Sequence, residues 1–347
     1  MRSPLWAVLP GGIDDPAAPS GGNRYDRVVL SLLDRDVHEI AITGSWPSPR
    51  AASRFALDQA LSEIPDKSDV LLDGLVACGV PDLLEVHAER LRLIVLVHLP
   101  LSDETGLSDA EAARLRALER RTLHVAAVVI ATSEQAARHL AEMHDLSEVE
   151  VAVPGVDPAP PAEPSPTGHR LLCVASVTPR KGQDLLVTAL QEHLADLRWQ
   201  CTFVGALSRP VPHTSPGIHF AGPRTGADLD ASYADADLFV LPSRAETYGM
   251  VVTEALARGL PVLATEVGGV PEALGLVPGG SRPGALIPPG DPVALAGALR
   301  EWLTDPELRR SWHAAALARR STLPAWSETA HRITEILRRT TSDGRHR

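Results

Sequence analysis

The sequence of 347 residues is long enough for two α/β domains of about 150 residues each. Hydrophobic residues make up 44% of it but aromatic residues only 4%, so we expect cores built mainly from Ala, Leu and Val. The formal net charge of −11 disfavours sequence-independent binding to nucleic acid, because an acidic chain repels the phosphate backbone.

Three cysteines, Cys78, Cys173 and Cys201, lie too far apart for a structural zinc site and are too few for a disulfide framework. The N-terminal apolar run is too short for a signal peptide, and no run reaches the roughly 18 apolar residues of a membrane span. Residues 113–121, ARLRALERR, could contact a membrane surface, but their interleaved Leu and Glu are more typical of a solvated helix. We therefore expect a reduced, cytoplasmic protein without a transmembrane segment.

Short apolar runs alternate with helix-length segments in the first half of the chain. Helices are expected at residues 108–123 and 134–143. Because the runs are apolar on both faces, they predict a parallel sheet that is covered on both sides. The predicted strands are Leu5–Leu9, Val37–Ile42, Val70–Leu72, Leu93–Val97, Val125–Ala131 and Val149–Val153.

A break follows at residues 154–169, PGVDPAPPAEPSPTGH, which contain six prolines. Proline lacks an amide proton and has a fixed backbone angle, so this segment resists helix and sheet and predicts a linker. The alternation then restarts, with helices expected at 183–194, at 249–258 and throughout the stretch from Pro292 onward. The predicted strands of this half are Leu171–Ala175, Cys201–Val204, Ile218–Phe220, Leu238–Leu241, Pro261–Ala264 and Ala285–Ile287.

The predicted fold class is α/β, with two Rossmann-like, doubly wound parallel-sheet domains facing each other across a deep cleft. We expect an N-terminal domain at residues 1–153 and a C-terminal domain at 170–322, joined by the proline-rich linker. Residues 323–347 would form a helix that crosses back to the first domain, followed by a short tail.

The densest motif is LPSRAETYGMVVTEALARGLPVLATEVGGVPEALG, at residues 241–275. A strand and a turn lead into a helix that we expect to begin near Tyr248–Met250, because Gly259 and Pro261 then mark its end. The N-terminus of such a helix attracts anions, since its first amides are unpaired and its dipole end is positive.

Two glutamates flank this helix start. Glu246 precedes it, and Glu254 lies about 7.5 Å along the axis from its first residues. The pair suits a ligand with phosphates at one end and a diol at the other. Two isolated glutamates are more often a partner of the helix dipole and an exposed helix residue than a ligand site. The motif around them is therefore needed to distinguish the two interpretations.

The whole segment resembles the donor-site signature of family 4 glycosyltransferases of the GT-B fold. That signature is Pro-Ser, a short spacer, Glu, seven residues, Glu-Ala, then Gly-x-Pro-Val and Gly-Gly-x-x-Glu. The chain matches it in order at Pro242-Ser243, Glu246, Glu254-Ala255, Gly259, Pro261-Val262, Gly268-Gly269 and Glu272.

The resemblance implies roles for these residues. Glu246 would approach the donor sugar and its phosphate end as a catalytic residue, and Glu254 would bind the ribose. The diphosphate and the sugar hydroxyls would be held by the backbone amides of Tyr248, Gly249, Met250 and Val251.

A second segment, VASVTPRKG at residues 174–182, follows a predicted strand and opens a helix. Arg180 and Lys181 could neutralise a diphosphate, or they could be two solvated charges on a loop. The family pattern is Gly-Arg-x-x-x-x-Lys-Gly, and Lys181-Gly182 occupy its last two places. Ser176 stands where the pattern has arginine, so the resemblance leaves Arg180 as the candidate substitute for it.

A third segment resembles the nucleobase-side loop of the family and places Phe220, Ala221 and Gly222 near the base. Asp235 and Asp237 are spaced like the metal-binding Asp-x-Asp of the other major glycosyltransferase fold. They lead directly into a strand, in a place where family 4 has a structural Ala-Asp. The resemblance therefore implies an enzyme without a metal or other cofactor.

The first half of the chain matches the family more loosely. Pro19–Asn23, PSGGN, holds Gly21 and Gly22, which would let the backbone approach the diphosphate closely or would form a turn before a helix. His98 follows the predicted strand LIVLV, where the family has a histidine, and would be a catalytic or acceptor-side residue or a plain cap. Asp73 follows the strand VLL and is a further acceptor-side candidate.

The resemblance implies a retaining, metal-independent glycosyltransferase of the hexosyltransferase type. It would transfer a sugar from a UDP- or GDP-linked donor to a hydroxyl of a small-molecule, glycan or lipid acceptor, by same-face attack guided by the leaving phosphate. The alternatives are a GT-B-fold epimerase and a non-catalytic nucleotide-sugar binding protein, the latter suggested by Ser176.

Overall fold

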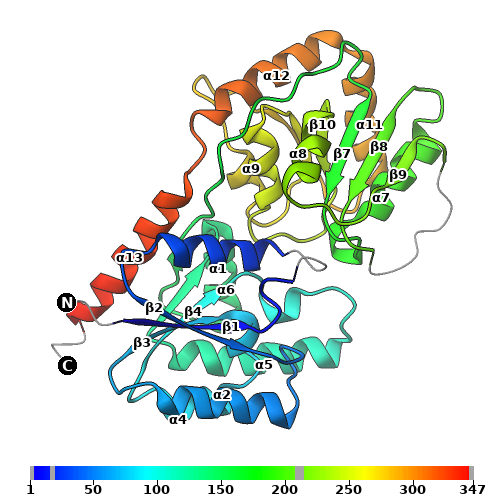
Figure 1. The fold of residues 1–347 in the computed structure, drawn as a ribbon. Helices are drawn as coiled ribbons and strands as arrows, with labels where there is room; N and C mark the ends of the chain where they lie inside the picture. Colours follow the sequence, from blue (N-terminus) through cyan, green and yellow to red (C-terminus); the bar gives the residue numbers. More distant parts are fainter. Residues whose placement is uncertain (1–3, 16–19, 208–214, 344–347) are drawn as a thin grey trace. The chain divides into compact units, whose positions relative to one another are not determined.

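The computed structural model describes residues 4–15, 20–207 and 215–343. The chain divides into two compact units, drawn with the sequence colours in Figure 1. The described part of the first unit comprises residues 4–15, 20–154 and 326–343, and that of the second unit comprises residues 155–207 and 215–325. The C-terminal segment from Trp326 thus belongs to the first unit.

The first unit is built on a six-stranded sheet in the order β2-β1-β3-β4-β5-β6, and all of its strand pairs are parallel. Every residue of the central strand β3 is buried, which is expected of a strand with helices on both faces. The strands are β1 Leu5–Pro10, β2 Val37–Ile42, β3 Asp69–Asp73, β4 Arg92–Val97, β5 Val128–Ala131 and β6 Glu150–Val151.

Helices follow the strands of this unit and supply the crossovers that parallel strands require. Their bounds are α1 Gly21–Leu32, α2 Ala51–Glu63, α3 Gly74–Ala77, α4 Pro81–His87, α5 Asp109–Val125, α6 Glu134–His144 and α13 Trp326–Asp343, with a 3₁₀ turn at Leu101–Asp103.

The helix α13 is held to the first unit by polar and aromatic contacts. The rings of Trp326 and Tyr25 on α1 meet edge to face at 5.8 Å, and the Tyr25 hydroxyl donates to the Ala152 carbonyl at 2.9 Å. Thr329 donates to the Val153 carbonyl at 2.8 Å. These contacts join the segment that follows β6 to the first and last helices of the unit.

The second unit repeats this architecture with the strand order β12-β11-β10-β7-β8-β9, again parallel throughout. Its strands are β7 Arg170–Val174, β8 Gln200–Val204, β9 Ile218–Phe220, β10 Leu238–Leu241, β11 Val262–Thr265 and β12 Gly284–Ile287. Its helices are α7 Gln183–Thr188, α8 Gly226–Ala234, α9 Met250–Ala257, α10 Val270–Leu274, α11 Pro292–Thr304 and α12 Pro306–Arg320, with a 3₁₀ turn at Pro179–Lys181.

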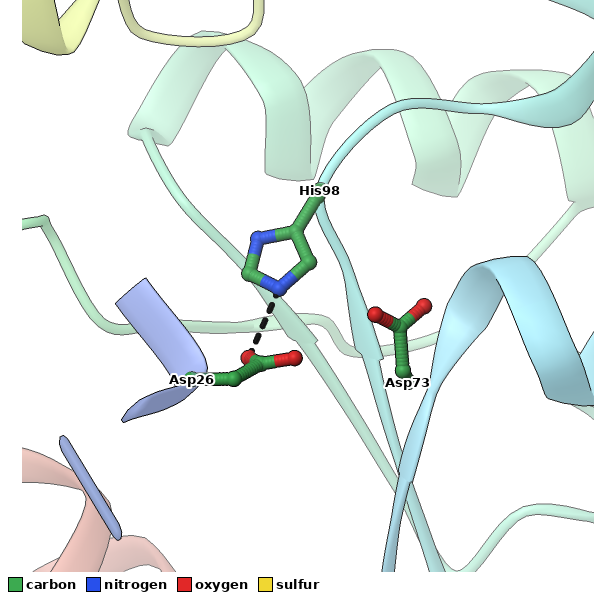
Figure 2. Close-up of side chains that lie close together, drawn as sticks. All are labelled: Asp26, Asp73 and His98. Carbon is green, nitrogen blue, oxygen red and sulfur yellow. Dashed lines mark hydrogen bonds and ion pairs between the residues drawn. The ribbon is translucent and has the colours of Figure 1, made fainter. Parts of the chain in front are cut away.

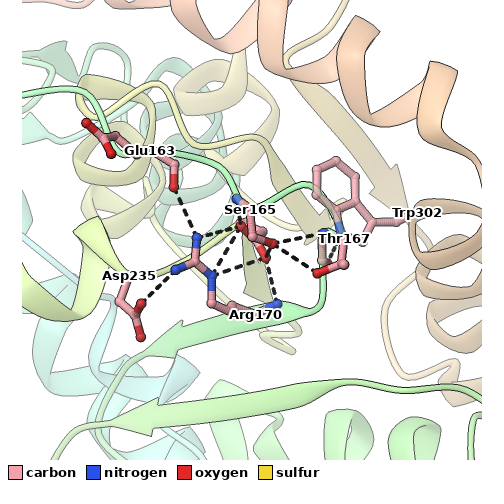
Figure 3. Close-up of polar contacts among 8 residues, drawn as sticks. Glu163, Ser165, Thr167, Arg170, Asp235 and Trp302 are labelled. Carbon is pink, nitrogen blue, oxygen red and sulfur yellow. Dashed lines mark hydrogen bonds and ion pairs between the residues drawn. The ribbon is translucent and has the colours of Figure 1, made fainter.

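Residues 152–169, which precede β7, form neither helix nor strand. The part next to β7 is anchored to the second unit (Figure 3). The buried Asp237 carboxylate accepts hydrogen bonds from the Ser165 hydroxyl at 2.7 Å and from the Arg170 amide at 2.9 Å. The Arg170 guanidinium contacts Asp237 and, at 2.7 Å, Asp235. Both aspartates therefore hold the segment that leads into β7. Their carboxylate oxygens accept from the Arg170 guanidinium, and those of Asp237 also accept from the Ser165 hydroxyl and from backbone amides.

The two parallel sheets confirm the predicted α/β fold class, and several element boundaries differ from the predictions. Val125 ends α5 rather than beginning a strand, because the Ala126 amide still donates to the Thr122 carbonyl at 3.1 Å. The expected helix at 183–194 is α7 followed by a π-helical turn at Ala189–His193. The strand expected at Val149–Val153 is shortened to Glu150–Val151, although the Ala152 amide still donates to the Ala131 carbonyl of β5 at 3.0 Å.

Candidate active site

Two loops of the second unit bring Glu246 together with both predicted phosphate-binding cations. Lys181 Nζ lies 2.6 Å from Glu246 Oε1, and Arg180 Nη1 lies 3.7 Å from Glu246 Oε2. The Ser243 hydroxyl donates to Glu246 Oε1 at 2.8 Å. Burial raises the pKa of Glu246, but Lys181 and then Arg180 reverse this and hold the pKa below its usual value. Glu246 is therefore an ionised carboxylate, with only 7% of its side chain exposed.

The close approach of the two loops depends on glycine. At Gly182, φ is +67°, and an added Cβ would lie 2.0 Å from the Pro242 carbonyl oxygen. At Gly268, φ is +47°, and an added Cβ would lie 1.6 Å from the Glu246 carbonyl oxygen. No other residue fits either position without moving the backbone. The glycines of the Lys-Gly and Gly-Gly pairs thus allow the backbone to pack closely around Glu246.

The helix after Glu246 begins at Met250, within the expected start at Tyr248–Met250. Gly249 has φ +89°, a left-handed conformation that lies outside the helix and directs the chain into it. Tyr248 is buried, with 3% of its surface exposed. The first turn of α9 has neither an acidic residue nor a side-chain cap, so its amides and positive dipole end are compatible with a bound anion.

Glu254 lies on α9 and contacts a residue that sequence reasoning missed. The hydroxyl of Tyr233, on α8, donates to Glu254 Oε2 at 3.0 Å. The Tyr233 ring is fully buried and carries the Arg258 guanidinium 4.5 Å from its centroid. These contacts orient the Glu254 carboxylate, which is half-buried.

The predicted nucleobase-side residues lie at the end of β9. Phe220 stacks on Phe203 with ring centroids 4.7 Å apart and planes 13° from parallel, so part of its ring belongs to the core of the second unit. The Ala221 amide donates to the Phe203 carbonyl at 2.8 Å, and the Gly205 amide donates to the Gly222 carbonyl at 2.9 Å. The backbone of this loop is therefore tied to the end of β8.

In the first unit, His98 and Asp73 lie together and are joined by Asp26, which the sequence analysis did not single out (Figure 2). His98 Nε2 lies 2.8 Å from Asp26 Oδ1. Asp73 ends β3 and caps α3, because its Oδ1 accepts from the Leu75 amide at 2.6 Å. Asp26 and Asp73 are buried, whereas 18% of the His98 side chain is exposed.

The three side chains perturb one another's ionisation. Burial, and then the charge of Asp26, raise the pKa of Asp73 to about 7. Burial lowers the pKa of His98, but the charge and hydrogen bond of Asp26, followed by the charge of Asp73, raise it overall to about 9. The cluster is consistent with a charged His98 and an Asp73 that exchanges its proton near neutral pH.

Gly21 and Gly22 are the first two residues of α1 rather than a loop, and they belong to the first unit, whereas Arg180 and Lys181 belong to the second. An added Cβ at Gly22 would lie 3.1 Å from the His98 ring. Gly22 therefore permits the close approach of His98 to α1, a packing role within this unit.

Among the residues that the structure describes, one group places His, Asp or Glu atoms close enough together to suit a metal ion, namely Asp26, Asp73 and His98. Its nearest atoms, His98 Nε2 and Asp26 Oδ1, are bonded to each other, so we describe the group as an acid–base cluster. Asp235 and Asp237 are engaged with Arg170, as shown above, and not with each other.

Asp26 and Tyr233 belong to no sequence motif, so sequence reasoning did not identify their contacts with His98 and Glu254. Asp26 lies five residues after Gly21, in a helix whose start the sequence did not delimit, and its partner is 72 positions away in the chain. Tyr233 lies 21 positions before Glu254. Contacts at such separations depend on strand order, which residue spacing alone does not determine.

The whole chain resembles solved structures of the GT-B fold. Sucrose-phosphate synthase from Thermosynechococcus elongatus superposes with a TM-score of 0.76 and 20% identity over 99% of this chain and 100% of that chain. HepE from Anabaena, solved in complex with UDP and glucose, gives a TM-score of 0.68 and 19% identity over 97% of this chain and 99% of that chain. The fold is GT-B, the class predicted from the motifs.

Sequence comparison finds glycosyltransferases among the similar proteins. Residues 168–305 match the model of glycosyl transferases group 1. D-inositol 3-phosphate glycosyltransferase of Kineococcus radiotolerans is 31% identical over 261 residues, 65% of this chain and 60% of that protein. The GDP-mannose-dependent monoacylated alpha-(1-6)-phosphatidylinositol monomannoside mannosyltransferase of Corynebacterium glutamicum is 32% identical over 207 residues, 52% of each protein.

These matches support the resemblance to family 4 glycosyltransferases of the GT-B fold that the donor-site motif indicated. It spans 60% and 62% of the length of the first two curated relatives that it matches. In the part of the chain that the structure describes, no helix combines the length and apolar character needed to cross a membrane.

Proposed function

We propose that this protein is a retaining glycosyltransferase that moves a sugar from a nucleoside diphosphate onto an acceptor hydroxyl. The observation that carries the proposal is the cluster of Lys181, Arg180 and ionised Glu246 in the loops that precede the uncapped helix α9. The group 1 glycosyltransferase match covers all of these residues. The names of the relatives and the UDP bound to HepE support a nucleotide-sugar donor.

The donor diphosphate would be stabilised by fixed positive groups. Lys181, Arg180 and the first amides of α9 would neutralise the charge that develops on the leaving phosphate, the kind of preorganised stabilisation that contributes most to many enzymes. Glu246, buried and held by Lys181 and Ser243, would face the donor sugar. Glu254, oriented by Tyr233, would accept hydrogen bonds from both ribose hydroxyls.

Retention of the anomeric configuration would follow from attack on the face from which the phosphate leaves. The bond from the anomeric carbon to the phosphate oxygen breaks, the bond to the acceptor oxygen forms, and the acceptor proton passes to the leaving phosphate. This route requires no protein base and no metal, so we propose metal-independent transfer. In the first unit, Asp73 and His98 are the proposed acceptor-side groups.

The donor would be a UDP- or GDP-linked sugar. HepE binds UDP, and the mannosyltransferase relative depends on GDP-mannose, so both bases have precedents among similar proteins. A thermal-shift panel of UDP, GDP and ADP with their sugar conjugates distinguishes them, because a ligand that binds only the native state raises the melting temperature.

The expected result is a shift of several degrees with one nucleotide, lost in Lys181→Ala and Glu254→Ala. The same nucleotide sugar should then release free nucleoside diphosphate slowly by hydrolysis. Isomerisation of the donor sugar without release would instead identify an epimerase, and binding without any turnover over a broad acceptor panel would identify a binding protein. The family match does not favour either of these alternatives.

A further inference from the structure

Three polar side chains meet at one edge of the first unit's sheet, and they come from three separate segments (Figure 2). Asp26 lies on α1, Asp73 ends β3, and His98 directly follows β4. One nitrogen or oxygen atom from each lies within 4.8 Å of the others. Ligands of open α/β sheets bind at this carboxyl edge of the strands, so the cluster lies where a substrate of this unit is expected.

Asp26 is held in a defined orientation. Its Oδ1 lies 2.8 Å from His98 Nε2, and only 4% of Asp26 is exposed. Its Oδ2 is buried without a hydrogen-bond partner among the described residues and points toward Asp73 in Figure 2. A buried carboxylate oxygen that faces a second carboxyl group is satisfied when the second group carries a proton.

The ring of His98 is fixed from several sides. Tyr25, next to Asp26 on α1, meets it edge to face at 5.2 Å. Gly22 approaches it so closely that an added Cβ would lie 3.1 Å from the ring. The acidic groups that face the ring are Asp26 from α1 and Asp73 from β3, while burial raises the pKa of the Tyr25 phenol and keeps it neutral.

We propose that Asp26 is a positioning residue that, with Asp73 beside it, keeps His98 as an imidazolium that donates hydrogen bonds instead of acting as a base. This role rests on the proposed glycosyl transfer. Each element of the geometry supports it: one carboxylate on Nε2, a second carboxyl beside the first, and a ring that cannot turn away. The pKa of His98, raised to about 9 by Asp26 and Asp73 against the opposing effect of burial, is consistent with it.

The proposal restricts the chemistry of the transfer. An imidazolium has no lone pair to accept the acceptor's proton, so that proton must pass to the leaving phosphate oxygen, as same-face attack requires. The charged ring can instead donate to a substrate oxygen and stabilise negative charge on it. The rate of transfer should therefore fall, not rise, when His98 loses its proton.

Titration of the histidine ring signals by NMR tests the proposal without any need for turnover. The His98 signals are assigned by their loss in His98→Gln and are followed from pH 5 to pH 10 in the whole chain. We expect a midpoint near 9, which moves toward the ordinary 6.5 in Asp26→Asn. A wild-type midpoint at or below 6.5 overturns the proposal, whether or not the Asp26 variant folds.

The matched control is Glu119→Gln, because Glu119 and His144 form a second buried pair in the same unit at 2.9 Å. This variant should leave the His98 midpoint unchanged. With a donor in hand, the pH dependence of kcat should show an alkaline limb near 9 that moves downward in Asp26→Asn but not in Glu119→Gln. Activity that increases as His98 deprotonates would overturn the proposed role. If no donor is turned over, the proposed function fails, and the NMR midpoint still decides the state of His98.

Discussion

Lys181 Nζ lies 2.6 Å from Glu246 Oε1, so the lysine predicted to bind the donor diphosphate is paired with the carboxylate predicted to face the donor sugar. Both side chains are largely buried, with 18% of Lys181 and 7% of Glu246 exposed. A buried pair of this kind stabilises little by itself, but removing one partner leaves an uncompensated charge. The two residues therefore depend on each other in the protein without donor.

Replacing Lys181 by Ala should weaken both binding and folding. We expect the Kd for the nucleoside diphosphate to rise about tenfold or more, because a charge-assisted contact contributes about 1.5–3 kcal/mol. The free energy of unfolding should fall by on the order of 3 kcal/mol, measured by urea denaturation, since Glu246 loses its closest cation. Arg300→Ala, which breaks an exposed pair with Asp196, should change neither by more than about 1 kcal/mol. Equal effects of the two variants would contradict this account of the cluster.

Gly268→Ala should destabilise the second unit more than Gly290→Ala. Both positions have positive φ, which by itself costs an alanine about 1–2 kcal/mol. At Gly268 the new Cβ would also meet the Glu246 carbonyl oxygen, whereas at Gly290 it meets nothing within 4 Å. Chemical denaturation of both variants isolates the difference, which we expect to be at least about 2 kcal/mol. Nucleotide binding should be lost only in Gly268→Ala.

The ribose role of Glu254 predicts a selective loss of affinity. Glu254→Gln should weaken UDP, GDP or ADP, whichever binds, by about tenfold, and should leave the affinity for inorganic diphosphate unchanged. Tyr233→Phe removes the hydroxyl that orients the carboxylate and should give a smaller loss of about 1 kcal/mol. Calorimetric titration with both ligands separates the ribose from the diphosphate contribution. An equal loss for inorganic diphosphate would assign Glu254 to the phosphates instead.

The acid–base cluster of the first unit predicts a pH-dependent stability. The folded pKa of His98, about 9, lies above its ordinary value of 6.5, mainly because Asp26 and Asp73 outweigh burial. Its stabilisation is therefore complete below pH 6.5 and is lost as pH rises through 9. The difference in unfolding free energy between wild type and His98→Gln should shrink by on the order of 3 kcal/mol from pH 6 to pH 9.5. A difference that does not change with pH would contradict the raised pKa.

Asp73 makes the stability depend on pH in a second, lower pH range. Because burial and Asp26 raise its pKa from 3.8 to about 7, the folded state retains a proton that the unfolded state has lost. The contribution of Asp73 to stability therefore declines between pH 4 and pH 7. Asp73→Asn should remove that decline, and urea denaturation at pH 4, 5.5 and 7 measures it.

Local pattern was sufficient to predict the strands and the fold class. The runs Val37–Ile42, Ile218–Phe220 and Leu238–Leu241 were predicted with their observed bounds, because apolar runs between turn residues determine strands of a buried parallel sheet. Helix ends were less predictable. The start of α9 was predicted only to within Tyr248–Met250, because the sequence pattern contains no information about the left-handed φ angle of Gly249 that precedes it.

The candidate site could be predicted only where a motif is contiguous. Glu246, Glu254 and Lys181 came from ordered motifs, and the structure joins Lys181 to Glu246. The partners that modify them came from elsewhere: Tyr233 orients Glu254 from the preceding helix, and Asp26 reaches His98 across 72 positions. Such contacts depend on tertiary packing, which single-sequence patterns do not encode.

The most direct test of the proposed donor site is calorimetric titration of the whole chain with UDP, GDP and ADP, in parallel with Lys181→Ala and Arg300→Ala. The account predicts that one nucleoside diphosphate binds with a stoichiometry of one per chain, that Lys181→Ala raises its Kd at least about tenfold, and that Arg300→Ala leaves it unchanged. Failure of all three nucleotides to bind, or binding that is indifferent to Lys181, would contradict the assignment of a nucleotide-sugar site to the second unit.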